Sequence, residues 1–197
     1  MVSFKIHLAL TLAFGSCGYA IKYPPGWKAS RLQDFQEMLD TGQKIWLTMS
    51  TKETGKIDCD YWEIIALNKT DYDFNHWYRK QPKGREWTKK GPQQKKEHLH
   101  AKLRYEGRRP AMLIRHYLEK ESLARAHKLL FWSGDEKCAV FEIPDGDCEQ
   151  RTWQSMLGQT YECDRVFFGL CGAFTYPVFK RSCISPNAIC VGITSLC

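Results

Sequence analysis

Residues 129–142 read LLFWSGDEKCAVFE, two apolar runs separated by the polar tetrapeptide SGDE at 133–136. Aromatic and β-branched residues favour strands, and a short break with Gly and Asp between two such runs is typical of a hairpin. A second break, PDGD at 144–147, leads into a further run that contains Trp153. This part of the chain therefore predicts antiparallel strands at 126–133, 137–143 and 151–157.

Short apolar runs also alternate with turn residues nearer the N-terminus. They predict strands at 43–50, 58–67, 73–80, 97–106 and 111–118, while 119–128 has the composition of either a turn and strand or a helix. Ahead of them, Ser30 to Asp40 predicts a short helix with Ser30 as its N-cap. Eight strands joined in sequence favour an all-β, up-and-down antiparallel barrel, which is wide enough to hold one small ligand.

The first twenty residues resemble a targeting segment. Lys5 is followed by an apolar stretch and by Gly18-Tyr19-Ala20, a small-x-small cleavage site. We therefore expect residues 1–20 to be a signal peptide and residues 21–197 to form one secreted, extracellular domain. The apolar stretch is too short to cross a bilayer, so we expect no membrane span.

Removing the signal peptide leaves an even number of cysteines. They are Cys59, Cys138, Cys148, Cys163, Cys171, Cys183, Cys190 and Cys197. An even count behind a signal peptide indicates an oxidising compartment and up to four disulfides. Asn68-Lys69-Thr70 is an N-glycosylation sequon, which predicts a glycosylated surface loop.

Positive charge is concentrated in the middle of the chain. Residues 79–128 contain 16 Lys and Arg but five Asp and Glu. The densest part, 79–96, is broken by Pro and Gly, and we expect a long basic loop there. It is either a solvated connection or a contact for a polyanion, an anionic membrane surface or a host protein. We expect no nucleic-acid partner and a monomer.

No catalytic constellation is present in the sequence. It lacks Gly-x-Ser-x-Gly, His-Glu-x-x-His and a phosphate-binding glycine loop. His98 and His100 lie two residues apart beside basic residues, which favours solvated histidines over a metal site. We therefore expect a binding protein without enzyme activity, cofactor or metal.

Strand periodicity indicates which side chains face inward. In 98–105, Leu99, Ala101, Leu103 and Tyr105 form the apolar face. In 112–118 the pattern fits either Arg115 with Tyr117 or Ile114 with His116, and 60–63 is equally ambiguous. An inward charge needs an opposite charge, so in a barrel it suggests a ligand partner.

The chain resembles the tick salivary lipocalins of the histamine-binding family. The resemblance rests on Leu130 to Val140, Cys148-Glu149, Trp153, Cys163-x3-Phe167-x3-Cys171-Gly172 and Cys183. It implies an eight-stranded lipocalin barrel with a C-terminal helix, which sequesters histamine or serotonin; other members hold leukotrienes or fatty acids, or bind host proteins. It also implies three disulfides, Cys59–Cys183, Cys138–Cys163 and Cys148–Cys171, and leaves Cys190 for Cys197.

Two departures from the family pattern concern the charge of the ligand. Amine binders carry Asp directly after the cysteine that corresponds to Cys138, where this chain has Ala139. Arg151 stands near the position of the acid or Trp in those proteins. An inward Arg151 would favour a carboxylate, so an anionic lipid mediator is an alternative to an amine.

We expect aromatic faces and charges from several strands to contact the ligand. The candidate ligand-binding residues are Trp46, Trp62, Tyr105, Arg115, Tyr117, Phe131, Glu149, Arg151 and Trp153. Asp60, Glu63 and Glu142 are further candidates for the acid. Trp153 is expected to form the floor of the cavity, the alternative being a plug beneath the C-terminal helix.

Overall fold

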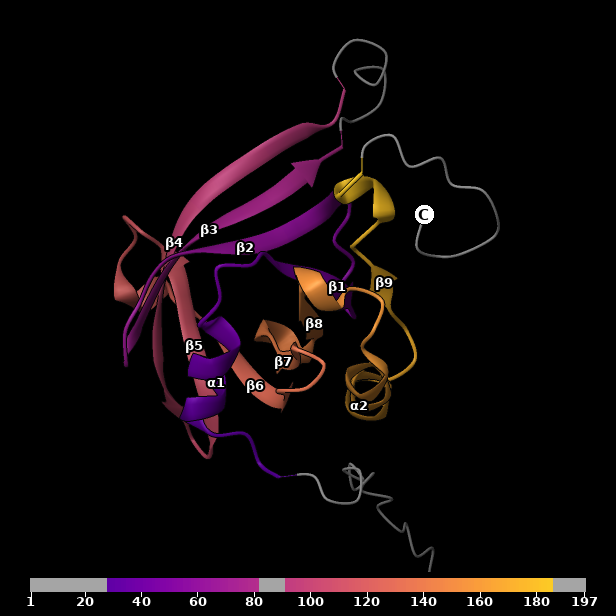
Figure 1. The fold of residues 1–197 in the computed structure, drawn as a ribbon. Helices are drawn as coiled ribbons and strands as arrows, with labels where there is room; N and C mark the ends of the chain where they lie inside the picture. Colours follow the sequence, from indigo (N-terminus) through magenta and orange to yellow (C-terminus); the bar gives the residue numbers. More distant parts are fainter. Residues whose placement is uncertain (1–27, 82–90, 186–197) are drawn as a thin grey trace, which may run out of the picture.

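The structure, a computed structural model, describes residues 28–81 and 91–185. Eight antiparallel strands in these ranges pair in chain order and close into a barrel, with a short ninth strand beside the first (Figure 1). This confirms the predicted fold. The strands are β1 Ile45–Ser50, β2 Ile57–Leu67, β3 Asp71–Lys80, β4 Gln93–Glu106, β5 Arg109–His116, β6 Arg125–Ser133, β7 Cys138–Glu142, β8 Cys148–Trp153 and β9 Tyr176–Pro177.

Helices lie at both ends of the described chain. They are α1 Leu32–Leu39 and α2 Tyr161–Cys171, with 3-10 turns at η2 Glu121–Leu123, η3 Pro144–Gly146, η4 Gln154–Met156 and η5 Arg181–Cys183. None of the helices within the described ranges is long and apolar enough to cross a membrane. The predicted signal peptide, Cys190 and Cys197 lie outside the described residues.

β1 closes the barrel by pairing along both of its edges. It runs antiparallel to β8 over most of its length, but it meets β2 through two residue pairs, Ile45–Trp62 and Trp46–Tyr61. Cys59 has a positive φ of 53°, within a shift of the β2–β3 register. Such a bulge bends the strand. Farther along, β1 pairs with β9 instead of β2.

α1 closes one end of the barrel. Three of its side chains are completely buried in the main core: Phe35, Met38 and Leu39. The backbone N–H of Arg31 donates to the Asp34 carboxylate at 2.6 Å, so Arg31 is the N-cap. The prediction of Ser30 as the cap was wrong by one residue, because Asp34 reaches back to Arg31 and not to Ser30.

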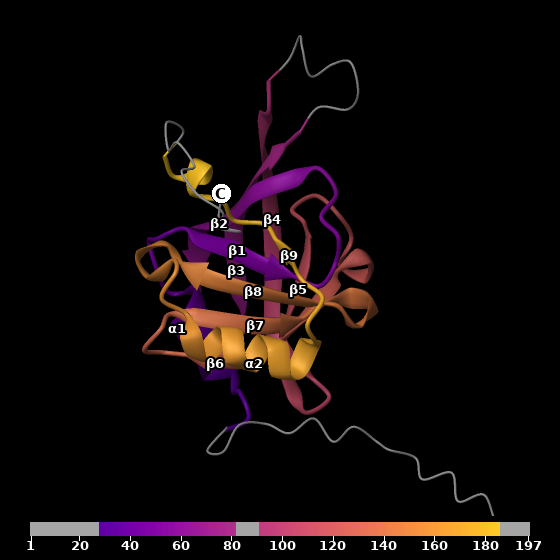
Figure 2. The same cartoon turned by 90° about the vertical axis from the view of Figure 1, so that its right-hand side faces the viewer.

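α2 covers the outer face of the barrel and contacts β6, β7 and β8 (Figure 2). It buries Cys163, Val166 and Phe167. The carboxylate of Glu136, in the β6–β7 turn, accepts the backbone N–H groups of Glu162 and Cys163. It thereby satisfies donors that a helix N-terminus leaves unpaired. Two disulfides, Cys138–Cys163 and Cys148–Cys171, attach the helix to β7 and β8.

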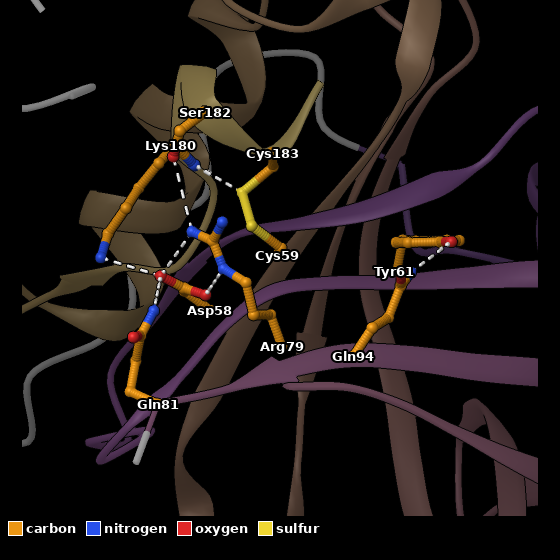
Figure 3. Close-up of a disulfide and its surroundings, with 9 residues drawn as sticks. All are labelled: Asp58, Cys59, Tyr61, Arg79, Gln81, Gln94, Lys180, Ser182 and Cys183. Atoms are coloured by element: carbon orange, nitrogen blue, oxygen red, sulfur yellow. Dashed lines mark hydrogen bonds and ion pairs between the residues drawn. A yellow bond between two sulfur atoms is a disulfide. The ribbon is translucent and has the colours of Figure 1, made fainter. Parts of the chain in front are cut away.

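The C-terminal part of the described chain runs along the same side of the barrel as α2 and is attached to β2 and β3. Figure 3 shows the Cys59–Cys183 disulfide and, beside it, the buried Asp58, whose carboxylate accepts from Arg79 at 2.7 Å and from Lys180 at 3.0 Å. Burial would raise the pKa of Asp58, but the hydrogen bonds from Arg79 and Lys180 lower it. Asp58 therefore stays ionised and links β2, β3 and the C-terminal segment. The three bridges that the family resemblance implied are thus all present.

Several predicted boundaries differ from the structure. β8 spans 148–153 and not 151–157, because 154–156 form a 3-10 turn. In 119–128 the chain forms the turn η2 and then enters β6, so the helical alternative was wrong.

The expected basic loop at 79–96 is shorter than predicted. β3 continues to Lys80 and β4 begins at Gln93, and these ends pair with each other. Gln93 to Lys96 are exposed, so no apolar alternation marks them as a strand. Residues 82–90, the rest of the segment, lie outside the described residues.

We expect the Cys59–Cys183 bridge to stabilise the fold more than Cys148–Cys171 does. The first spans 124 residues and the second 23. The chain-entropy model gives contributions of about 5 and about 3 kcal/mol. Double Ala variants of each pair, compared by chemical denaturation, measure the difference. An equal or smaller loss for Cys59/Cys183 would contradict this expectation.

Candidate functional site

The barrel encloses a cavity of about 460 Å³. α1 lies at the end where β4 turns into β5, since the backbone N–H of Leu32 contacts the Tyr105 hydroxyl. The cavity extends toward the other end, where Leu123 and Arg125 are exposed. Its lining residues are Asp60, Trp62, His76, Glu97, Leu99, Ile114, Arg115, His116, Glu119, Leu123, Arg125, His127, Glu149 and Arg151.

Arg151 is the central charge of this cavity. Its guanidinium, 3% exposed, bonds to Asp60 at 3.0 Å and to Glu149 at 3.1 Å. It also lies over the ring of Trp62, with Cζ 3.6 Å from the ring centroid. The Trp face and the two carboxylates therefore surround the cation on three sides, which is the environment that compensates a buried charge.

His76 extends this network on the other side of Asp60. Its Nε2 lies 2.7 Å from the Asp60 carboxylate. Burial would raise the pKa of Asp60, but the charges of His76 and Arg151 outweigh it and lower this pKa to about 2. Burial would lower the pKa of His76, but its attraction to Asp60 and the hydrogen bond between them raise it. Asp60 is therefore ionised at neutral pH.

Two further cavity residues have acceptor capacity. Glu97 accepts the hydroxyl of Tyr78 at 2.7 Å, and this bond raises the pKa of Tyr78 to about 12. His127 lies edge-on to Trp62, and burial lowers its pKa, so it is neutral at pH 7. Its Nδ1 is buried with no hydrogen-bond partner among the described residues. The cavity thus contains polar atoms that a ligand can satisfy.

Arg115 at the cavity mouth forms its hydrogen bonds with backbone carbonyls. One of its terminal nitrogens donates to the carbonyls of His116, Tyr117 and Glu119. Arg115 therefore holds the turn after β5.

Carboxylates outnumber guanidinium groups in the lining. The lining has four carboxylates, Asp60, Glu97, Glu119 and Glu149. It has three guanidinium groups, Arg115, Arg125 and Arg151. Arg115, Arg125 and Glu119 belong to the mouth. The interior holds Asp60, Glu97 and Glu149 against Arg151 and His76, whose pKa is raised, so one carboxylate is in excess when His76 is protonated.

Four of the predicted ligand-binding residues lie in this cavity: Trp62, Arg115, Glu149 and Arg151. Asp60, which the sequence left as one of several candidate acids, joins them. Glu63 and Glu142 lie away from the cavity. Glu63 accepts the indole N–H of Trp77, and Glu142 pairs with Arg109 and Lys128.

Three predicted residues pack elsewhere in the molecule. Trp46 is buried between Tyr61 and Phe179, where the C-terminal segment covers the barrel wall. Phe131 packs in the cluster beneath α2. Trp153 donates to the carbonyl of Met38 in α1, so it supports the closed end and is neither the cavity floor nor a plug beneath α2.

Tyr105 and Tyr117 are also outside the cavity, with 52% and 49% of their surface exposed. Both lie at or just beyond the end of a strand. A side chain that the alternation places on the inner face there points past the end of the barrel and not into its interior. Tyr117 instead stacks on His98 at 4.3 Å between ring centroids.

His76, Glu97 and His127 line the cavity but were not among the ligand-binding residues predicted from the sequence. Each is a polar residue near the polar or basic end of a strand, where the apolar alternation begins or ends. The only sequence signal was the strand period itself, which places residue 76 on the same face as Phe74, and residue 97 on the same face as Leu99.

Asn68 lies exposed in the turn between β2 and β3. Its Oδ1 accepts the backbone N–H groups of Thr70 and Asp71. An exposed turn suits the predicted glycosylation, which stays a prediction.

Comparisons place the chain among known proteins. Residues 27–185 match the family model described as tick histamine binding protein. The solved structure of AM182 in complex with serotonin is 18% identical, with a TM-score of 0.53 over 75% of this chain and 90% of that one. Japanin from Rhipicephalus appendiculatus bound to cholesterol is 10% identical, with a TM-score of 0.52 over 71% and 93%. No curated protein matches. The two structures show a shared fold.

We expect the Asp60–His76 pair to give a pH-dependent contribution to stability. Since folding raises the pKa of His76, the contribution is full below the unfolded value of about 6.5 and is lost as pH rises through the folded value. Urea denaturation of wild type and His76→Gln across this range measures it. The wild type's advantage should be largest at the acidic end; an advantage that grows with pH would contradict this.

Proposed function

Because the chain belongs to the tick histamine-binding protein family, we propose that it is a secreted protein that sequesters a small amine in its barrel. The observation that supports this most is the group of three carboxylates around Trp62, Asp60, Glu97 and Glu149, against two basic groups, the buried guanidinium of Arg151 and the ring of His76. Such a surplus of negative charge, desolvated by the barrel and beside an aromatic ring, suits a cationic ligand.

The pairing of Arg151 argues against an anionic ligand in the interior. Its guanidinium already bonds to Asp60 and Glu149. A fatty-acid carboxylate would have to displace one of these ionised groups, and the displaced carboxylate would be left buried without its partner. Truncating or displacing one member of a buried charge pair is strongly unfavourable.

Glu97 and Glu149 are the acids that we assign to the ligand. Asp60 has two partners within hydrogen-bond distance, Arg151 and His76. Glu149 bonds to Arg151, and Glu97 accepts from Tyr78 and lies 3.9 Å from His76 Nδ1. A carboxylate has about four acceptor positions. An ammonium group placed between Glu97 and Glu149 would use these, while the ring of an aromatic amine would lie against Leu99.

The proposed mechanism is stoichiometric capture. A cavity of about 460 Å³ lies within the range of small-molecule sites. Removal of a mediator depends on affinity and slow release, and differences in affinity between related complexes reside mostly in the dissociation rate. Secretion is part of the proposal, and three disulfides, which persist in oxidising compartments, support it.

Salt dependence separates this function from polyanion binding by the basic segment 79–96. Lys95 and Lys96 are exposed on β4, so any binding there weakens as ionic strength rises. Amine capture inside the barrel should change little over the same range. Calorimetry with histamine, serotonin and heparin at low and moderate salt distinguishes the two.

We expect Glu97→Gln to weaken binding of histamine or serotonin about fivefold, as loss of one half-exposed charge contact is worth roughly 1 kcal/mol. Glu106→Gln is the matched control, on the same strand and paired with Arg104. Isothermal calorimetry at pH 7.4 compares the variants. Equal affinities for Glu97→Gln and wild type would remove Glu97 from the site, and no binding of either amine would contradict the proposed function.

We expect Arg151→Met to strengthen amine binding about tenfold, because it frees Asp60 and Glu149 from their fixed cation. The control Arg125→Met removes the same charge from the exposed mouth, where solvent screens it. Calorimetry with histamine and with arachidonate shows whether the site prefers a positively or a negatively charged ligand. Tight arachidonate binding that Arg151→Met abolishes would instead support the anionic alternative. Arg151→Met should also lower the melting temperature, which circular dichroism records.

A further inference from the structure

A second cavity lies outside the barrel and has no part in the proposed function. Its volume is about 610 Å³, larger than that of the interior cavity. It is bounded by the outer face of β1 and β8, by α2, and by the chain from β9 to η5. Figure 2 shows α2 running across the barrel wall, with the following segment passing over β1.

The floor of this second cavity is a buried amide. Gln150 is 1% exposed, and its Nε2 donates to Asp164 Oδ1 at 2.7 Å. A carboxylate cannot donate, so this bond fixes the amide orientation and directs Oε1 away from Asp164. That oxygen is buried and has no hydrogen-bond partner among the described residues. A buried acceptor without a partner is costly, so it marks a place that a donor would stabilise.

The groups around Gln150 also act as acceptors. Thr160 donates its hydroxyl to Asp164 Oδ1 at 3.0 Å, so it adds no free donor. Thr48 uses its hydroxyl on the carbonyl of Gln150 at 3.1 Å. Asp164 has no cationic partner among the described residues. The floor of the cavity therefore offers oxygen acceptors and a negative charge, and the lining carries a positive charge, Arg181, at its η5 edge.

The walls of the cavity are apolar. They include Met49, Leu157, Phe168, Pro177, Phe179 and Ile184. Phe168 and Ile184 expose 46% and 52% of their surface. Burying such apolar area is favourable at roughly 25 cal/mol per Å². A ligand with an apolar body would thus gain from the walls and a donor group from the floor.

We propose that this cavity is a second ligand site, for a molecule with an apolar body and one hydrogen-bond donor, a hydroxyl or an ammonium group. The donor satisfies Gln150 Oε1 beside Asp164, and the body lies between α2 and β9. A carboxylate at Gln150 would meet an acceptor and a negative charge, so this floor disfavours anions; the cation in the lining, Arg181, is exposed at the η5 edge of the cavity. The two sites are separate because successive residues of β8 face opposite ways: Glu149 and Arg151 line the interior, Gln150 the outside.

A matched series of probes tests the head group. Octan-1-ol, octylamine and octanoate share one chain, and isothermal calorimetry or ligand-observed NMR at millimolar concentration measures their affinity. We expect the alcohol and the amine to bind the outer cavity and octanoate to bind at least about tenfold more weakly, since its head leaves the buried acceptor unpaired. Equal affinity of all three, or no binding of any, overturns the proposal.

A pair of Leu→Trp variants tests the location. Leu157→Trp fills the outer cavity, and Leu123→Trp narrows the mouth of the barrel cavity. Octanol binding should fall at least about tenfold with Leu157→Trp and stay within about twofold with Leu123→Trp, as filling a pocket removes the buried apolar area. Histamine binding should show the reverse pattern, so that failure of either site is seen separately.

The opposite dependence of octanol on the two variants would place it in the barrel and overturn the second site. Circular dichroism melting shows whether Leu157→Trp is folded. If it is not, Phe168→Ala on the exposed side of α2 replaces it, with an expected loss of at least about threefold in octanol affinity. No change with Phe168→Ala would overturn the proposal equally.

Discussion

The ion pair between Arg151 of β8 and Asp60 of β2 joins two strands that β1 separates. β1 has six residues and shares two residue pairs with β2, so few backbone hydrogen bonds close the barrel between these two strands. Removing the two charges from water costs several kcal/mol for each ion unless every partner is in place. Glu149, His76 and the ring of Trp62 supply those partners. The network that spans the closure therefore also forms the inner end of the ligand cavity, and neither can change without the other.

The strand order and the N-terminal helix could be predicted because turn residues and apolar runs are local signals, whereas the C-terminal helix and the pairing of six cysteines were implied by the family resemblance. Side-chain direction was predictable where the alternation is long and regular: Leu99 lines the cavity, and Ala101 and Leu103 are in the core. It failed at Tyr105, where β4 reaches the end of the barrel. Near Asp60 the period was ambiguous, because the positive φ of Cys59 adds a bulge that no pattern of apolar residues records. The site depends on such non-local features of register.

β8 shows how one strand serves two environments. Glu149, Arg151 and Trp153 face the interior, while Cys148 and Gln150 face α2. Two disulfides hold α2 on that outer face. Most of an antiparallel barrel's outer surface is solvated. Here α2 covers the outer face of β8, so a polar side chain on that face, such as Gln150, needs a hydrogen-bond partner within the protein. Asp164 satisfies the amide nitrogen of Gln150 and leaves its oxygen without one. The covering helix therefore creates a second polar interior outside the barrel.

Arg151 has two opposing effects on a cationic ligand. It competes with the ligand for Asp60 and Glu149, because its guanidinium occupies their acceptors and the face of Trp62. It also helps to hold the pKa of Asp60 at about 2, together with His76. Without internal cations, carboxylates in a barrel would have raised pKa values and would become neutral, and a neutral acid attracts a cation weakly. Arg151 and His76 therefore keep Asp60 ionised. Of the two acids assigned to the ligand, Glu149 is shared with Arg151, so Glu97, which Arg151 does not contact, carries the larger part of the interaction.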